Sequence, residues 1–95
     1  MTTNSVKMNA YGMVLTGREY GKNAAAEIFG DGKTPHTFDF SGVASVGSSF
    51  VDEIFKAGVI AGITQFDIIG ANKIVQFSLK QAASDLEITL HMELI

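Results

Sequence analysis

Two adjacent serines, Ser48 and Ser49, are the side chains of this sequence best placed to do chemistry. They follow Gly47, where a glycine-containing turn is predicted to give way to a helix. The first turn of a helix carries N–H groups without partners and a partial positive charge. A hydroxyl there can cap the helix, and a phosphate attached to it would be stabilised by the same donors. The sequence therefore supports two interpretations, helix caps or a regulatory phosphorylation site.

A serine nucleophile is not indicated, because the sequence provides no suitable base for the pair. Serine catalysis requires a base within hydrogen-bond reach and a third group that orients the base. The two histidines, His36 and His91, fall on predicted strands, on the sheet face opposite the helices. The residues around Ser48 also lack the G-x-S-x-G pattern of a nucleophile elbow. We therefore expect a protein without enzymatic activity.

Metal-binding and nucleotide-binding patterns are also missing from the sequence. His36 and Asp39 are three residues apart on a predicted strand, so their side chains point to opposite faces. His91 and Glu93 share a face but supply only two ligands. The Gly-Lys-Thr stretch at 32–34 follows a helix rather than a strand and lacks the glycine spacing of a P-loop. The sequence therefore predicts no metal and no cofactor.

Two acidic residues, Asp52 and Glu53, follow the serines closely. Their simplest explanation is that they lie in the first turn of the helix, whose positive end stabilises carboxylates. The alternative is that they belong, with the serines, to a surface that binds a partner. That candidate partner-binding surface comprises the residues that open the helix: Gly47, Ser48, Ser49, Phe50, Asp52 and Glu53.

The composition limits the environments and partners that we expect. The 95 residues fit a single domain spanning 1–95. The formal net charge is −3 and the seven cations are scattered, which argues against a nucleic-acid partner. No cysteine is present, which fits a reducing cytosol. No segment approaches the roughly 18–20 apolar residues of a membrane span, and residues 1–5 lack the features of a signal peptide. We expect a cytoplasmic protein without a membrane partner.

Hydrophobic periodicity predicts the elements that must position these residues. Alternation predicts five strands, over residues 6–10, 13–15, 36–40, 65–69 and 87–94. Helical spacing predicts three helices, with Thr16 and Asn72 as N-caps of the first and third. Tyr11 and Gly12 predict a hairpin between the first two strands, and 42–47 is expected to be a turn.

The resulting order, β-β-α-β-α-β-α-β, is typical of an α/β domain. Strands that alternate with helices favour parallel neighbours joined by right-handed crossovers. The predicted sheet is therefore mixed but mostly parallel, with the N-terminal hairpin as its antiparallel part. Because the strands alternate instead of being continuously apolar, the helices are expected mainly on one face.

Two stretches of the sequence resemble the STAS superfamily, which includes the anti-sigma-factor antagonists. The nearest resemblance is to its STAS-like branch, the DUF4325 family. That branch has a central D-F-S-G-V-x-S-V-x-x-S-F-x-D-E-x-F pattern, which residues 39–55 match. It also has an N-terminal L-x-x-R-x-x-G pattern, which residues 15–21 match. The element order agrees with this family over nearly the whole chain.

The resemblance implies a STAS-like fold with a switch loop at the start of the second helix. In the antagonists this loop is Asp-Ser-Ser-Gly, and its first serine is phosphorylated by a partner kinase that resembles histidine-kinase ATPases. Ser48 matches the phosphorylated serine, and Ser49 the next one. Gly47 and Phe50 stand here in place of the aspartate and the glycine of that loop, and Phe50 would supply an apolar contact, either to the core or to a partner.

Three functions follow from the sequence as hypotheses. The leading one is a non-enzymatic signalling module that binds a protein partner through Ser48–Phe55, under the control of serine phosphorylation. The resemblance implies a histidine-kinase-type ATPase as that partner. The alternatives are a domain that binds a small ligand or nucleotide, and a structural homodimer.

Overall fold

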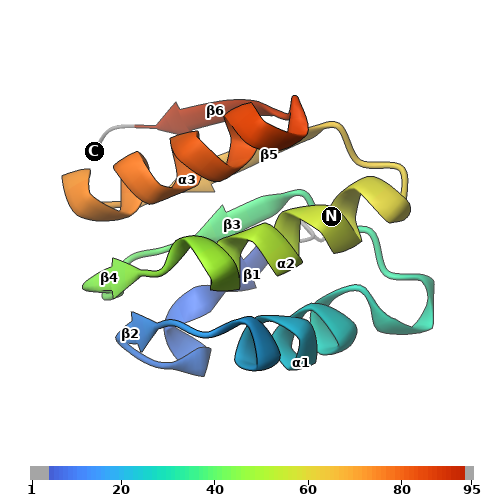
Figure 1. Ribbon diagram of the computed structural model, residues 1–95, viewed down its shortest axis with the longest axis horizontal. Helices are drawn as coiled ribbons and strands as arrows, with labels where there is room; N and C mark the ends of the chain where they lie inside the picture. Colours follow the sequence, from blue (N-terminus) through green and yellow to red (C-terminus); the bar gives the residue numbers. More distant parts are fainter. Residues whose placement is uncertain (1–4, 94–95) are drawn as a thin grey trace.

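Three helices cover one face of a four-stranded parallel sheet in the computed structural model, which describes residues 5–93 (Figure 1). The helices are α1 (Arg18–Ile28), α2 (Ser48–Ile60) and α3 (Lys73–Leu86). The sheet strands are β1 (Ser5–Lys7), β3 (Thr37–Asp39), β5 (Gln65–Ile69) and β6 (Thr89–Glu93), in that spatial order. Two shorter strands, β2 (Val14–Leu15) and β4 (Ser45–Val46), pair in parallel, and two 3-10 turns are η1 (Met8–Tyr11) and η2 (Gly30–Gly32). The predicted α/β class with a mostly parallel sheet is confirmed.

The sheet has one apolar and one more polar face, as the alternation predicts. Phe38 is the register partner of Val6 on one side and of Ile68 on the other. Phe38 and Ile68 are buried beneath the helices, whereas Thr37 and Asp39 stay partly exposed on the opposite face. Since successive side chains of a strand point to opposite faces, this register fixes both surfaces of the sheet at once.

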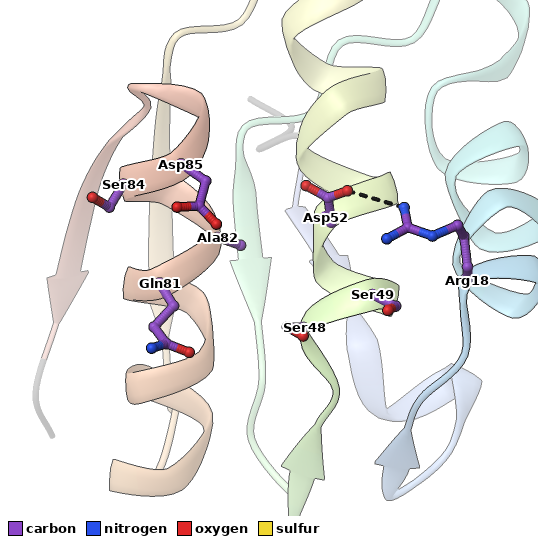
Figure 2. Close-up of a pocket in the computed structure, with 8 residues that line it drawn as sticks. All are labelled: Arg18, Ser48, Ser49, Asp52, Gln81, Ala82, Ser84 and Asp85. Carbon is purple, nitrogen blue, oxygen red and sulfur yellow. Dashed lines mark hydrogen bonds and ion pairs between the residues drawn. The ribbon is translucent and has the colours of Figure 1, made fainter.

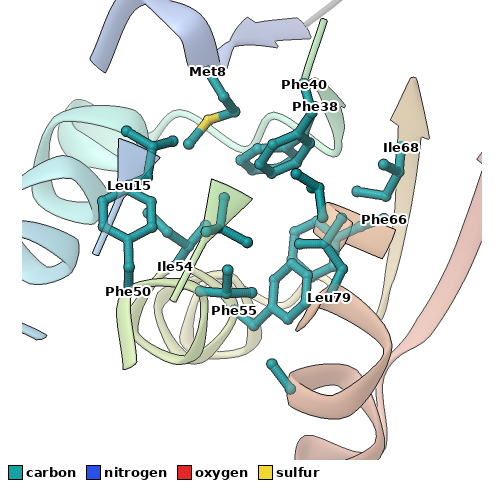
Figure 3. Close-up of a cluster of buried hydrophobic side chains, with 14 of the residues drawn as sticks. Met8, Leu15, Phe38, Phe40, Phe50, Ile54, Phe55, Phe66, Ile68 and Leu79 are labelled. Atoms are coloured by element: carbon teal, nitrogen blue, oxygen red, sulfur yellow. The ribbon is translucent and has the colours of Figure 1, made fainter. Parts of the chain in front are cut away.

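Aromatic side chains fill much of the space between the sheet and the helices (Figure 3). Phe55 of α2 stacks on Phe66 of β5 with the ring centroids 5.0 Å apart, and Phe38 meets Phe66 edge-on at 5.5 Å. Gly58 makes room for this cluster, because a Cβ there would lie 2.3 Å from Cζ of Phe66. The cluster holds α2 over the middle of the sheet, between α1 and α3 (Figure 1).

The predicted N-terminal hairpin is wrong. β1 pairs with β3 and β2 pairs with β4, both in parallel, so the first two strands do not pair with each other. The chain leaves β1 as the 3-10 turn η1, in which Met8 is fully buried in the core. The predicted turn at 42–47 is also wrong in part, because it contains β4. Alternation detected the strands but not their partners, since pairing depends on contacts between distant segments.

Tyrosine hydrogen bonds connect η1 to α1. The Tyr11 hydroxyl donates to Glu27 Oε1 at 2.5 Å, and the Tyr20 hydroxyl donates to the Tyr11 carbonyl. Burial, together with the bond to Glu27, raises the pKa of Tyr11 to about 12. These bonds fasten both ends of α1 to the turn that precedes β2.

Helix capping agrees with the sequence at α3 only. Asn72 accepts from the Val75 N–H at 2.8 Å, which confirms it as the N-cap of α3. Its Nδ2 also donates to the carbonyls of Val43 and Ala44, at 3.3 and 3.0 Å, and so ties α3 to the loop before β4. The N-cap of α1 is Gly17 instead of the predicted Thr16, and no side chain caps that helix.

α1 and α2 touch through their backbones at Gly21. A Cβ at this position would lie 2.8 Å from the Phe50 carbonyl oxygen, closer than real Cβ atoms approach. Ala24 and Ala25 continue the small buried side of α1 beyond this point. The two helices are therefore locked at a separation that only glycine allows. None of the helices described within residues 5–93 has the length and apolar character needed to cross a membrane.

Replacing Gly21 with alanine should destabilise the fold. Overpacking of a tight contact costs about 1–3 kcal/mol, and the better helix propensity of alanine returns at most about 1 kcal/mol. Because the opposing atom belongs to the backbone, we expect a net loss of about 1–2 kcal/mol. Urea denaturation followed by circular dichroism measures this difference. Gly30→Ala is the matched control, since a Cβ at Gly30 would meet nothing within 4 Å. An unchanged or higher stability of Gly21→Ala would contradict the close contact.

Candidate functional site

A groove of about 450 Å³ lies at the start of α2, between α3 and the first turn of α1 (Figure 2). It is lined by Arg18, Ser48, Ser49, Asp52, Gln81, Ala82, Ser84 and Asp85. Three of these residues, Ser48, Ser49 and Asp52, belong to the candidate surface expected from the sequence. The structure adds Arg18 from α1 and the second half of α3. The site is therefore built from three helices that are distant in the sequence.

The serines are not helix caps. They are the first two residues of α2, the N-cap is Gly47, and no side-chain hydrogen bond caps the helix. Ser48 is exposed and Ser49 is partly exposed. Of the two interpretations from the sequence, the capping interpretation is therefore wrong. Both hydroxyls border the groove, where a partner or a modifying enzyme can reach them.

Arg18 joins the two acidic residues of α2 to α1. Its Nη1 donates to Asp52 Oδ2 at 3.0 Å and also to Glu53 Oε2. Lys56 adds a second cation to Asp52, with its Nζ 3.0 Å from the same oxygen. Burial would raise the pKa of Asp52, but the hydrogen bonds from Arg18 and Lys56 outweigh it and hold that pKa below its usual range.

This ion pair corrects the sequence interpretation of the acids. α2 begins at Ser48 and has no acidic residue in its first turn, so Asp52 and Glu53 lie beyond the turn in which the helix dipole acts. Their partner is Arg18, which carries the R of the L-x-x-R-x-x-G pattern. The two sequence patterns therefore meet each other in space. Only two features of the sequence indicate this ion pair. They are the adjacent carboxylates at 52 and 53, and the single arginine, which stands three residues before a glycine.

Phe50 does not belong to the candidate surface. Its side chain is fully buried, 5.5 Å from Tyr20 between ring centroids, and it cannot contact a partner in this fold. Gly47 is partly exposed and lies close to Thr16. A Cβ at Gly47 would be 3.2 Å from Thr16 Cγ2. Phe50 therefore belongs to the core, and Gly47 allows a close approach of two loops.

An outward stripe on α3 was missed by the sequence analysis. Ile74, Phe77 and Gln81 follow at spacings of three and four, so they lie on one side of the helix. Ile74 and Phe77 are each 64% exposed, and Gln81 lines the groove beside Ser48. The buried stripe of the same helix comprises Val75, Leu79, Ala82 and Ala83. Ile74 and Phe77 fall outside it, and they were the available indication in the sequence of a second face.

The polar side chains that line the groove carry hydroxyl, amide, carboxylate and guanidinium groups. Neither His36 nor His91 lines it, and His91 Nδ1 instead lies 3.5 Å from Asp67 Oδ1 on the sheet. Within residues 5–93 no group of three histidine, aspartate or glutamate side chains could hold a metal ion. The groove offers three hydroxyls, one amide, two carboxylates and a guanidinium already bound to the carboxylates of Asp52 and Glu53.

Comparisons with known proteins found no matching family model, no matching curated protein and no matching solved structure. The function of the groove must therefore be argued from its own residues.

Acid should weaken the fold through the carboxylate of Asp52. Its pKa is lowered in the folded state, so at acidic pH the unfolded chain binds more protons than the folded chain. The stabilisation is complete above about pH 4 and is lost as the pH falls through the folded pKa. Asp52→Asn should therefore be less stable than the wild type at pH 7, and this difference should shrink near pH 3.

Urea denaturation at both pH values tests this expectation. Asp85→Asn is the matched control, since it removes an exposed carboxylate from the same groove. A difference between Asp52→Asn and the wild type that does not change with pH would show that the ion pair contributes nothing to stability.

Proposed function

We propose that this chain is a non-enzymatic regulatory module that binds a protein partner through the outer sides of α3 and the start of α2. We call this region the α3–α2 surface and define it by Ile74, Phe77, Gln81, Ser48 and Ser49. The observation that carries the proposal is the exposure of Ile74 and Phe77, 64% each, on the stripe that continues into the groove of Ser48. Apolar side chains gathered on a surface with polar neighbours are typical of protein-binding sites.

The arrangement suits a protein better than a small molecule. Small ligands are held in concave sites that bury most of their surface. Here the large apolar side chains project from α3 beside the groove instead of forming its walls. An aromatic side chain such as Phe77 serves as an anchor when a partner covers it, and the hydroxyls and amide beside it supply hydrogen bonds at the rim.

Serine phosphorylation is proposed as the control of this surface. A phosphate on Ser48 or Ser49 would add about 1.5 to 2 negative charges at pH 7. It would stand one turn from Asp52 and near Arg18, whose guanidinium is already shared by two carboxylates. The added charge would compete for Arg18 and repel an acidic partner. The surface would therefore bind different partners before and after modification.

The class of partner rests on the resemblance to the STAS superfamily, and membership of that superfamily is part of the proposal. The resemblance implies a histidine-kinase-type ATPase that both binds and phosphorylates the module. The accessibility of Ser48 supports this assignment. The glycine and the buried phenylalanine at positions 47 and 50 mean that a kinase would meet a different loop from that of the antagonists.

Phe77→Ser should weaken the complex with a histidine-kinase-type ATPase from the same gene neighbourhood. Burial of a phenylalanine contributes about 1.5–3 kcal/mol, which corresponds to about tenfold to a hundredfold in Kd. Isothermal titration calorimetry measures the change. Val59→Ser, at the far end of α2 and 43% exposed, is the matched control and should bind as the wild type does.

Phosphorylation is tested in the same system. After incubation with the ATPase and ATP, mass spectrometry of the chain should find one phosphate in the peptide that contains Ser48 and Ser49. Single alanine variants identify which serine carries it. The absence of both a complex and a phosphate would refute the proposed function.

A further inference from the structure

A second groove, of about 830 Å³, lies between the second halves of α1 and α2, away from the serines. Its apolar lining includes Ala25 of α1, Phe29 at the C-cap of that helix, and Ala57 and Ile60 of α2. The two helices run side by side here, as they do at Gly21 (Figure 1). The groove is shallow and open, so it resembles a channel on the surface more than an enclosed pocket.

Ile60 is the most exposed large apolar side chain of residues 5–93. It is 87% exposed, at the last position of α2, where the core does not need it. Single exposed apolar residues are ordinary on protein surfaces. Ile60 differs because it borders an apolar groove, so a partner that enters the groove would cover the side chain and the groove floor together.

The rim of this groove is positively charged in a chain of net charge −3. Lys22, Lys33 and Lys56 line it, which are three of the seven cations of the sequence. The acid among the described lining residues is Glu53, and its carboxylate accepts a hydrogen bond from Arg18. Lys56 is shared with Asp52 but keeps a side chain that is half-exposed. The groove therefore presents cations around an apolar floor.

We infer that this groove is a docking site for an amphipathic, acidic helix of a partner protein. From Glu53 to Ala61 the α2 side of the groove is about 12 Å long, which is enough for two turns of a partner helix lying alongside it. Apolar side chains at i, i+3, i+4 and i+7 of that helix would pack on the alanines and Ile60. Acidic side chains on its flanks would pair with the lysines of the rim. A small ligand is disfavoured, because an open channel would leave much of its surface in water.

This second site goes beyond the proposed function, because it shares no residue with the α3–α2 surface. Glu53 is the link between the two regions, since it lines the second groove and also binds the arginine that borders the first. A partner helix here would pack against both α1 and α2. The site would remain in place even if α3 bound nothing.

The experiment uses the full chain labelled with 15N and two synthetic helical peptides of about five turns, ~18 residues each. Both peptides carry leucines at i, i+3, i+4 and i+7, and the flanking positions are glutamates in one and lysines in the other. We expect the acidic peptide to bind at least about tenfold more tightly, the margin that 1.4 kcal/mol provides. Chemical-shift changes should be confined to residues 22–34 and 53–61.

Variants separate this site from the α3–α2 surface. Ile60→Asp should weaken binding of the acidic peptide more than tenfold, and Lys22→Glu should weaken it and reduce the preference for the acidic peptide. Both positions are exposed, so circular dichroism should show an unchanged fold. Phe77→Ser should leave peptide binding unchanged, whatever its effect on the proposed function.

Three results would overturn the inference. They are no binding of the acidic peptide, equal affinity for the two peptides, and chemical-shift changes on the α3–α2 surface. A separate titration uses vesicles of anionic phosphatidylglycerol in place of the peptides. Stronger binding to vesicles than to the peptide, with loss in Ile60→Asp, would assign the groove to a membrane surface and would also overturn the inference.

Discussion

The backbone contact between α1 and α2 at Gly21 determines the geometry of both candidate sites. Because a Cβ at this position would collide with the Phe50 carbonyl, the helices can lie this close only with glycine there. One turn earlier on α1, the same closeness brings Arg18 within hydrogen-bond distance of Asp52. One turn later, it leaves a channel floored by alanines. The distance between α1 and α2 thus determines where Arg18 meets its carboxylates and where the apolar groove lies.

The start of α2 leaves both serine hydroxyls without a capping role. An ordinary helix start uses a serine hydroxyl as a cap, which would occupy the side chain with backbone N–H groups. Here Gly47 is the N-cap without a side-chain bond, and the start of α2 is held instead by the ion pairs of Asp52 and Glu53 one turn away. Asp52 and Glu53 therefore stabilise the start of α2, while the serines of the same helix stay accessible.

The single layer of helices has a consequence for where partners can bind. Three helices side by side on one face bury one stripe each against the sheet and expose the opposite stripes. On α3 the exposed stripe carries Ile74 and Phe77, and on α2 it ends at Ile60. The chain is acidic as a whole, yet three of its six lysines line the groove between α1 and α2. We propose a protein partner at the first region because two large apolar side chains are exposed there, and an acidic helix at the second because lysines surround its apolar floor.

The sequence alone determined the features that depend on neighbouring residues. The strand at Phe38, the helix that follows Asn72 and the one-sided placement of the helices all follow from local periodicity and from one capping side chain, and all are present in the structure. Tertiary structure decided the rest. β1 pairs with β3 instead of with its neighbour in sequence, and Phe50 contributes to the core, so it is not available to a partner beside the serines. Arg18 found partners 34 and 35 residues away. The contacts of Arg18 depend on how closely α1 and α2 approach each other. That distance is set by the absence of a side chain at Gly21, which no local pattern of apolar and polar residues reveals.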